Sequence, residues 1–258
     1  MNLMMLLEMA AEGLGDRVAV GSLDDGLTYR QLYDRAHGAA NHYRAAGVES
    51  AVVCDESSPA LPIALFGSAW AGIPYVPLNY RLPADDLLAL AERAGSAVAI
   101  ADESKLEWLG GLPGVSSVSA EAFSADPAAG TDGHASPGDW NMDPDDLAVL
   151  LFTSGTTGSP KSAVLRHKHL VSYILGSVEF MGAGEDEATL VSVPPYHIAG
   201  VASMLSSVYA GRRIVQLPRF DPDVWIDTVE REGVTHAMVV PTMLTRIVDT
   251  LDARGGAP

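Results

Sequence analysis

The chain has 258 residues, of which 48% are hydrophobic, and its 33 acidic and 16 basic side chains give a formal net charge of −17 at pH 7. This composition can bury a sizeable core and excludes a disordered chain, while the negative charge opposes nonspecific binding to nucleic acid or anionic lipid. A single cysteine, Cys54, excludes a disulfide framework and a cysteine-based zinc site. We therefore expect a cytoplasmic protein with no nucleic-acid partner.

The N-terminal residues 1–13 predict an amphipathic helix. No basic region precedes their apolar run, and Glu8 interrupts it, which argues against a signal peptide. The uncharged stretch from Ser57 to Tyr80 is long, but three prolines divide it. A buried helix followed by a strand explains this stretch better than a membrane span does, so we predict no transmembrane segment.

Strand and helix signals alternate along the chain, which predicts an α/β fold with predominantly parallel sheets and flanking helices. Thr28 with Gln31 forms a capping box for a helix that runs to Ala46 and stops at Gly47. The predicted strands cover residues 18–23, 52–54, 97–101, 147–152, 189–193, 213–217 and 236–240. The other predicted helices cover residues 61–71, 83–93, 169–181, 198–210, 222–232 and 241–252.

The region around residues 120–145 is rich in Ala, Gly, Ser, Asp and Pro, which is typical of a surface linker. After it, the alternation of strands and helices restarts. We therefore predict an N-terminal subdomain over residues 1–140, which includes the start of this linker, and a second subdomain over residues 141–258.

A polar segment without any large apolar group follows the predicted strand 147–152 directly. Glycines let backbone N–H groups approach a ligand closely, hydroxyls donate hydrogen bonds to oxyanions, and lysine adds a positive charge. The segment therefore predicts a loop that holds phosphate at the exit of a parallel strand, with a plain polar strand–helix turn as the alternative. Its order is Thr153-Ser154-Gly155-Thr156-Thr157-Gly158-Ser159-Pro160-Lys161.

The phosphate loop does not match two common signatures. A Walker A loop would require glycine where Pro160 stands, and a dinucleotide fingerprint shares only the spacing of Gly155 and Gly158. Continued to residue 167, the segment closely resembles the phosphate-binding signature of the adenylate-forming (AMP-binding) superfamily. Many members have glycine after the lysine, where this chain has Ser162. Residues 72–79, Gly-Ile-Pro-Tyr-Val-Pro-Leu-Asn, are also similar to a block of that family.

A second loop, Pro194-Pro195-Tyr196-His197-Ile198-Ala199-Gly200, follows the predicted strand 189–193. Loops at the carboxyl ends of strands in an open parallel sheet face the ligand crevice, so both loops should open onto one cleft. The second loop is similar to the proline–aromatic–histidine loop of acyl-CoA and aryl-CoA ligases. That resemblance implies that Tyr196, His197 and Gly200 line an acyl site. A helix-capping turn with a structural histidine is the alternative.

The resemblance implies the N-terminal part of an ATP-dependent, AMP-forming carboxylate–CoA ligase of the acyl-CoA synthetase branch, acting on a fatty or other hydrophobic acid. ATP and Mg²⁺ are the implied cofactors, and CoA is the co-substrate. Thr157 is implied at the metal, and Lys161 and His197 as catalytic residues. The residues implied to hold the β- and γ-phosphates are Thr153, Ser154, Gly155, Thr156, Thr157, Gly158 and Lys161.

Other family segments do not occur in this sequence, namely Tyr-Gly-x-Thr-Glu, a ribose-binding aspartate, a hinge and a lysine on a mobile C-terminal domain. We therefore expect an incomplete second subdomain, no C-terminal lysine-bearing domain, and no catalysis by these residues alone. Exposed apolar surface would favour a homo-oligomer. The alternative is a noncatalytic nucleotide-binding or interaction module built on the same fold.

The remaining histidines carry weaker signals. His167 and His169 stand two residues apart and cannot both face one ion from a helix, so we predict that both are solvated. His37 and His42 belong to a polar helix and are predicted at the surface, and His236 is predicted to be structural.

Overall fold

The computed structural model describes residues 1–128, 138–153 and 161–256. Its strands are β1 (Val18–Val20), β2 (Leu27–Thr28), β3 (Ser50–Cys54), β4 (Tyr75–Pro77), β5 (Ala97–Ala101), β6 (Val115–Ser119), β7 (Leu147–Thr153), β8 (Lys161–Arg166), β9 (Ala188–Val191), β10 (Arg213–Gln216) and β11 (His236–Met238). Its helices are α1 (Met4–Gly13), α2 (Tyr29–Ala46), α3 (Ala60–Ala71), α4 (Ala84–Arg93), α5 (Glu103–Gly110), α6 (Ala120–Ala125), α7 (His167–Ser177), α8 (Ile198–Ala210), α9 (Pro222–Glu232) and α10 (Pro241–Ala253).

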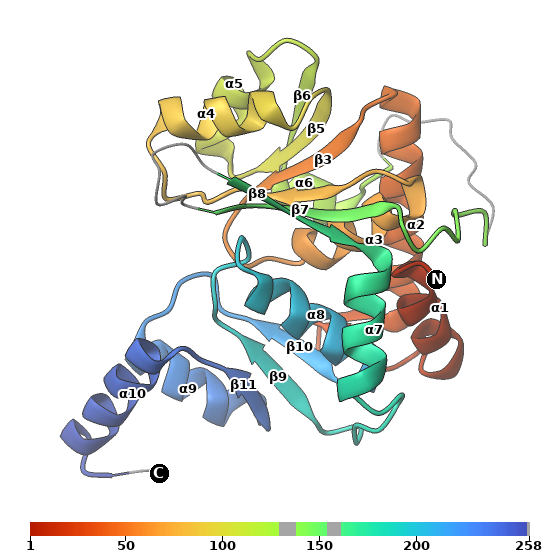
Figure 1. Ribbon diagram of the computed structural model, residues 1–258. Coiled ribbons are helices and arrows are strands. Elements are labelled where there is room, and N and C mark those ends of the chain that lie inside the picture. Colours follow the sequence, from red (N-terminus) through yellow and green to blue (C-terminus); the bar gives the residue numbers. More distant parts are fainter. Residues whose placement is uncertain (129–137, 154–160, 257–258) are drawn as a thin grey trace.

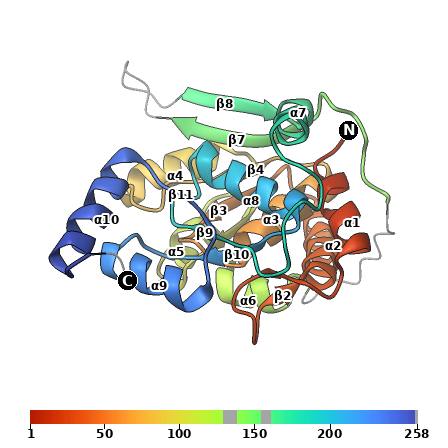
Figure 2. The same ribbon diagram turned by 90° about the horizontal axis from the view of Figure 1, so that it is seen from below.

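These strands form two sheets, which Figures 1 and 2 show with helices between and around them. The six-stranded sheet has the order β6-β5-β3-β4-β7-β8, and the five-stranded sheet has the order β11-β9-β10-β1-β2. Neighbouring strands are parallel except for the pairs β7–β8 and β1–β2. The predicted α/β class with predominantly parallel sheets is therefore confirmed.

Local sequence signals match the observed elements closely. Thr28 Oγ1 accepts the N–H of Gln31 at 3.2 Å and Gln31 Oε1 accepts the N–H of Thr28 at 2.8 Å, so the predicted capping box is present. The helix ends at Gly47, whose φ of +61° suits glycine. Helices α8 and α9 have the predicted bounds. The structure adds elements that the sequence patterns do not predict, namely β2, α5, β6, α6 and β8.

Both faces of the inner strands β3 and β5 are buried, and alternate residues face different cores. On β3, Ala51 and Val53 join a large core, while Val52 and Cys54 join a smaller one. The large core contains residues of α1, α2, α3 and α8 together with residues from both sheets. The smaller core packs under α4 and α5, and a third core covers the outer face of the five-stranded sheet under α9. The molecule therefore has a layer of helices between its two sheets (Figure 1).

The two halves of the sequence exchange strands between the sheets. Strands β1 and β2 come early in the chain but extend the five-stranded sheet, where Val20 pairs with Ile214 of β10. Strands β7 and β8 come later but extend the six-stranded sheet, where Val149 pairs with Tyr75 of β4. The sheet boundaries therefore do not coincide with residue 140, and the division into residues 1–140 and 141–258 stays a prediction. Helix α6 lies in the predicted linker, whose residues 129–137 fall outside the described ranges.

The first residues of the chain are anchored to distant segments. The Met1 ammonium group donates to the carbonyl of Met142 at 2.8 Å. The buried Asn2 side chain donates through Nδ2 to the carbonyls of Ala69 at 3.1 Å and Asn141 at 2.8 Å. These bonds join the start of α1 to the end of α3 and to the segment that leads into β7.

The prediction that His167 is solvated is wrong. His167 is 1% exposed, and its Nδ1 accepts the N–H of Leu3 at 3.2 Å. Burial, the larger cause, and the nearby N-terminal ammonium group together lower the pKa of His167 to about 4. His169 remains exposed, and its Nδ1 accepts the N–H of Arg166 at 3.2 Å, so α7 begins two residues before the predicted start.

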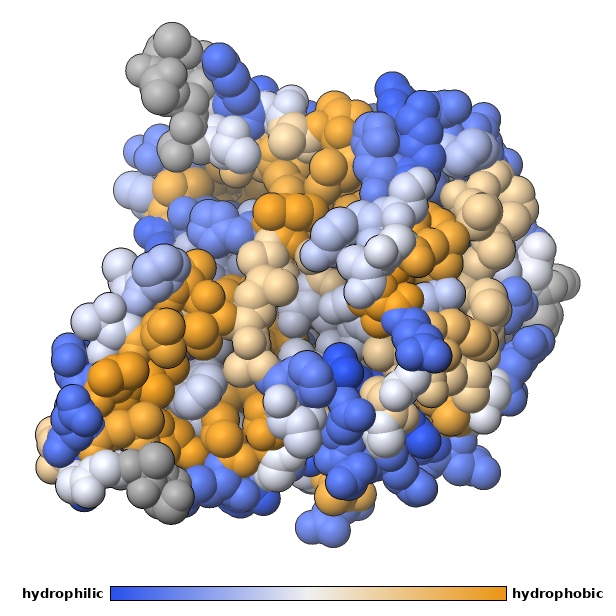
Figure 3. Space-filling model, turned by 60° about the horizontal axis from the view of Figure 1, so that its bottom comes forward, coloured by the Kyte–Doolittle hydropathy of each residue, from blue (hydrophilic) through white to orange (hydrophobic). Residues whose placement is uncertain are grey.

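Apolar surface remains exposed at the end of the five-stranded sheet. Strand β11 is an edge strand, and Val240, Leu244 and Val248 of the following segment are 44–52% exposed. Figure 3 shows hydrophobic surface in this region, near the C-terminal residues at the lower left. Among the described helices, none combines the length and hydropathy needed to cross a bilayer.

Acid should destabilise the fold through His167. Its ordinary pKa is 6.5 and its folded pKa is about 4, so the unfolded chain takes up the proton first as the pH falls. The stability that neutral His167 gives the fold is fully present above pH 6.5 and is lost between that pH and the folded pKa, with a size of about 3 kcal/mol. Urea unfolding of His167→Asn, which keeps an acceptor near Nδ1 but does not titrate, should show a flatter pH profile between pH 7 and 4. The matched variant His169→Asn should follow the unmodified chain, and a flat profile in the unmodified chain would contradict this reading.

Candidate functional site

The two ends of the predicted phosphate loop are held together by a β-ladder. Thr153 at the end of β7 pairs with Lys161 at the start of β8, and Thr153 Oγ1 donates to the Lys161 carbonyl at 3.4 Å. Both residues are exposed. The next element is an antiparallel strand, so the alternative of a strand–helix turn is wrong. No helix start therefore follows the loop directly to add its dipole to a phosphate site.

The remaining residues predicted for the phosphates lie outside the described ranges, and so does the predicted metal-side residue Thr157. Their roles, and that of Lys161 as a catalytic and phosphate-binding residue, stay predictions. Within the described part of the chain, no three His, Cys, Asp or Glu side chains are grouped to hold a metal ion. The predicted phosphate-loop residues that lie outside the described ranges are Ser154, Gly155, Thr156, Thr157 and Gly158.

The second predicted loop connects β9 to α8, and its bonds fix the start of that helix. The N–H of His197 donates to the Pro194 carbonyl at 3.1 Å, and the N–H of Gly200 donates to the His197 carbonyl at 3.0 Å. Gly200 is buried, and a Cβ there would lie 3.0 Å from the Pro195 Cα. This close approach gives Gly200 a packing role in the loop. The rings of Tyr196 and His197 are 4.6 Å apart.

The second loop contacts the segment that follows β4. The ring of Tyr80 meets the ring of Tyr196 edge to face, with centroids 5.6 Å apart. The Arg81 guanidinium lies 5.4 Å from the centroid of the Tyr80 ring. Because β4 is the parallel neighbour of β7, the second loop lies against the loop next to the phosphate loop. Tyr80 and Arg81 were missed by sequence reasoning, although they directly follow the family-like block 72–79.

These segments enclose a cavity of about 310 Å³. Its walls come from residues that follow three parallel strands of the five-stranded sheet, β9, β10 and β11, and from residues that follow β4 of the six-stranded sheet. Loops at the carboxyl ends of parallel strands are the usual place for a ligand crevice. Its charged and titratable wall residues are Tyr80, Arg81, His197 and Arg246, and no Asp or Glu lies among its described wall residues. Apolar wall residues include Val193, Phe220 and Met243. A chain with a strong negative net charge therefore has a cationic cavity at this edge of the sheets.

The pKa values of both titratable rings of the second loop are shifted in the direction that favours their neutral forms. Partial burial lowers the pKa of His197, and the positive charge of Arg81 lowers it further. Partial burial also raises the pKa of Tyr196, against the opposing effect of Arg81. Near neutral pH, His197 can therefore donate one hydrogen bond and accept another without carrying charge.

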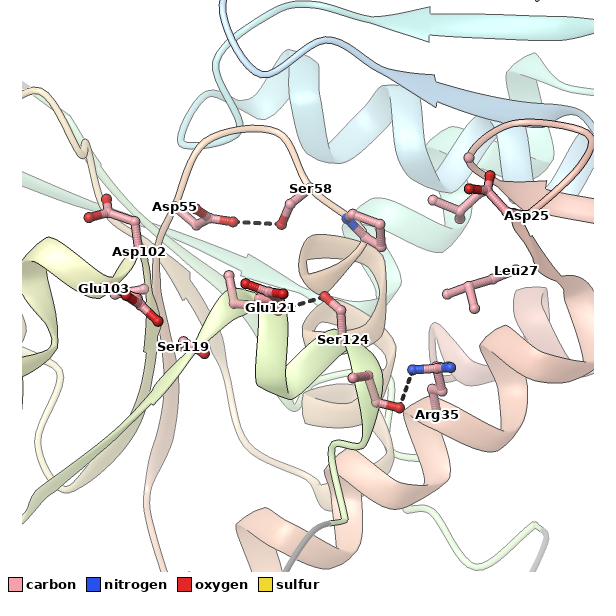
Figure 4. A pocket seen from close by; sticks show the side chains of 17 residues that line it. Asp25, Leu27, Arg35, Asp55, Ser58, Asp102, Glu103, Ser119, Glu121 and Ser124 are labelled. Atoms are coloured by element: carbon pink, nitrogen blue, oxygen red, sulfur yellow. Dashed lines mark hydrogen bonds between the residues drawn. The ribbon is translucent and has the colours of Figure 1, made fainter.

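A larger cavity, of about 920 Å³, lies at the carboxyl ends of β3, β5 and β6 (Figure 4). Its walls hold five carboxylates and a single cation, Arg35. The buried Asp55 accepts a 2.5 Å hydrogen bond from Ser58, and burial raises the pKa of Asp55. Such a wall repels phosphates and carboxylates, so this cavity is not the candidate site despite its size. The five carboxylates in the wall of this larger cavity are Asp25, Asp55, Asp102, Glu103 and Glu121.

The family follows from comparison with known sequences. The model of the AMP-binding enzyme family matches residues 7–257, so the chain belongs to this family of adenylate-forming enzymes. Over 225 residues it is 32% identical to a feruloyl-CoA synthase of an Amycolatopsis species, covering 86% of this chain and 45% of that protein. The chain spans about half the length of the curated relatives it matches.

Solved structures agree with this assignment. ATP-bound MatB from Rhodopseudomonas palustris superposes with a TM-score of 0.80 at 29% identity, covering 96% of this chain and 51% of that chain. O-succinylbenzoate coenzyme A synthetase (MenE) from Bacillus subtilis, in complex with ATP and magnesium ion, superposes with a TM-score of 0.74. That match has 22% identity, covers 94% of this chain and 65% of the other, and shows likeness of fold alone.

Removal of the Arg81 charge should raise the pKa of His197. In Arg81→Gln the imidazolium no longer faces a neighbouring positive charge, but burial, the larger cause, still acts. The pKa should therefore move toward its ordinary value without reaching it. Proton NMR titration of the His197 ring would measure this shift, with Arg212→Gln, outside the cavity, as the control. An unchanged pKa in Arg81→Gln would show that the two side chains are not electrostatically coupled.

Proposed function

We propose that this chain carries the phosphate-loop and acyl-loop half of an ATP-dependent, AMP-forming carboxylate–CoA ligase. The observation that carries the proposal is the cationic cavity, which joins the predicted acyl loop to the segment after β4, the parallel neighbour of β7. Its positive walls suit a carboxylate, and its apolar walls suit the rest of an acid. Family membership supports the same reaction class.

In this reaction, a carboxylate oxygen attacks the α-phosphorus of ATP and pyrophosphate leaves. The thiolate sulfur of CoA then attacks the carbonyl carbon of the acyl-adenylate, which releases AMP and gives the thioester. Both steps depend on positioning and on stabilisation of developing charge. Thr153 and Lys161, at the two ends of the hairpin loop, would orient the β- and γ-phosphates. Bound Mg²⁺ would neutralise charge on the phosphate oxygens, with Thr157 as a protein ligand.

On the acyl side, the neutral His197 ring would orient the reacting carboxylate, and Arg81 would attract it into the cavity. Tyr196 and Gly200 would shape the wall beside it. The cavity of about 310 Å³ is at the lower end of the range for ligand pockets. Its size favours a compact acid, aromatic or short-chain, over a long-chain fatty acid. The name of the feruloyl-CoA synthase, which shares 32% identity, points to an aromatic acid as well.

The whole activity requires groups that the sequence lacks, so we expect residues 1–258 to bind nucleotide and acid without turning them over. Loss of a single well-placed electrostatic donor typically costs about a hundred- to a thousand-fold in rate. Acid-dependent ATP–pyrophosphate exchange separates this proposal from a noncatalytic module. The ligase half should gain exchange when the missing family segments are supplied, and a noncatalytic module should not.

Lys161→Ala should weaken binding of MgATP to the chain about ten- to a hundred-fold. The change removes a charge-assisted contact with phosphate oxygens, worth about 1.5–3 kcal/mol. Isothermal titration of MgATP into both proteins would measure the difference. Lys168→Ala is the matched control, because this exposed lysine lies seven residues after Lys161 and is paired with Asp145. Equal affinities of Lys161→Ala and the unmodified chain would remove Lys161 from the phosphate site.

His197→Ala should weaken binding of the acid more than binding of MgATP. The His197 ring forms part of the cavity wall. The substitution removes the hydrogen bond from this ring to the bound carboxylate, which should weaken the binding free energy of the acid by about 1.5–3 kcal/mol. Parallel titrations with an acid and with MgATP would separate the two effects, with His169→Ala, outside the cavity, as the control. An equal loss for both ligands would identify a structural histidine.

A further inference from the structure

The candidate acyl cavity adjoins a second cavity, of about 780 Å³, which takes residues from the segments after β3, β4, β5 and β10. Three residues line both cavities, namely Tyr80, Arg81 and Pro218. These three residues therefore form the wall between the two cavities. Tyr80 is partly buried and packs against the smaller core of the six-stranded sheet.

The ring of Tyr80 joins the segment after β4 to the acyl loop. It meets the ring of Tyr196 edge to face, with centroids 5.6 Å apart, and the ring of Tyr196 lies 4.6 Å from that of His197. The described contacts of the Tyr80 side chain are made by its ring. Phenylalanine at this position would therefore keep these contacts, and alanine would remove them.

The same ring holds the Arg81 guanidinium, whose carbon lies 5.4 Å from the Tyr80 centroid. Arg81 is exposed, and a long exposed side chain loses conformational entropy when it is held in one place. A stacking contact with an aromatic ring offsets part of this loss. The charge of Arg81 lowers the pKa of His197, so its held position matters at the cavity.

We propose that Tyr80 is a positioning residue of the acid site: its ring supports the acyl loop through Tyr196, fixes the Arg81 guanidinium at the cavity, and closes this cavity toward the larger one. This inference rests on the proposed function, because it takes the cavity as the acyl site. Tyr80 acts through its neighbours and not on the reacting atoms. Without the ring, Arg81 would turn freely into solvent, and the two cavities would become continuous.

The first test compares Tyr80→Ala with Tyr80→Phe in residues 1–258. Affinities for benzoate, ferulate, hexanoate and MgATP would be measured by NMR titration. For each acid that the unmodified chain binds, Tyr80→Ala should bind about three- to thirty-fold more weakly, and Tyr80→Phe should stay within about two-fold. The affinity for MgATP should be the same in all three proteins. Tyr173→Ala, at an exposed tyrosine of α7 outside both cavities, is the control.

The second test measures the pKa of the His197 ring by proton NMR. Partial burial and the charge of Arg81 both lower this pKa, and both causes weaken in Tyr80→Ala. The pKa should therefore rise toward its ordinary value in Tyr80→Ala and stay unchanged in Tyr80→Phe. Because Tyr80 acts partly through Arg81, adding Arg81→Gln to Tyr80→Ala should raise the pKa by less than Arg81→Gln alone does.

Unchanged acid affinities or an unchanged His197 pKa in Tyr80→Ala would overturn the inference while the acyl site of the proposed function stands. An equal loss of acid affinity in Tyr80→Phe and Tyr80→Ala would assign the effect to the hydroxyl group and reject the positioning role of the ring. An equal loss for the acids and MgATP would show a merely structural residue. If the unmodified chain binds none of the three acids, the proposed acyl site fails and the inference falls with it.

Discussion

The parallel pairing of strands from opposite halves of the chain is the constraint on which the rest of the structure depends. Strand β7 pairs with β4, and β1 pairs with β10, so each sheet contains strands from both halves. The helices between the sheets are buried only when both sheets are present, because their shared core takes residues from each. Since parallel strands end at the same edge, the loops after β9, β10 and β11 of the five-stranded sheet lie together. The loop after β4 of the other sheet meets them at the cavity, because the shared core holds the two sheets against each other.

Charge is distributed very unevenly over this framework. The chain carries 33 acidic side chains, yet none lies among the described walls of the candidate acyl cavity, and five gather in the larger cavity at the ends of β3, β5 and β6. A strongly negative molecule repels anions over most of its surface, and the cationic wall of this cavity attracts them locally. The neutral state of His197 follows from the same field, because Arg81 and partial burial both disfavour its charged form.

Predictions based on local signals agreed with the structure where a short segment determines the outcome. The capping box of Thr28 and Gln31 and the left-handed Gly47 depend on neighbouring residues, and both are present. The polar strand β6 lacks a clear apolar pattern, since its residues are only partly buried and it lies at a sheet edge. The strand β8 is exposed along most of its length, so its residues lack the apolar pattern that would predict a strand.

The histidine at position 167 shows where local reasoning fails. The spacing of His167 and His169 excludes a shared metal on one helix face, but it carries no information on what packs against that helix. Residues at the opposite end of the sequence bury His167, and the N–H of Leu3 uses its ring nitrogen. Only a contact between distant segments explains its depressed pKa.

The sequence by itself determined the fold class, most helices and the family resemblance, and it singled out two loops as candidates for ligand binding, because hydrophobic period, capping residues and loop composition are local properties. It could not show that Tyr80 and Arg81 stand beside Tyr196, or that Phe220 and Arg246 complete the same cavity. Those residues lie in different segments and share no sequence signal. Only the pairing of strands into two sheets brings their segments to one edge, and this pairing depends on the burial of the shared helical core.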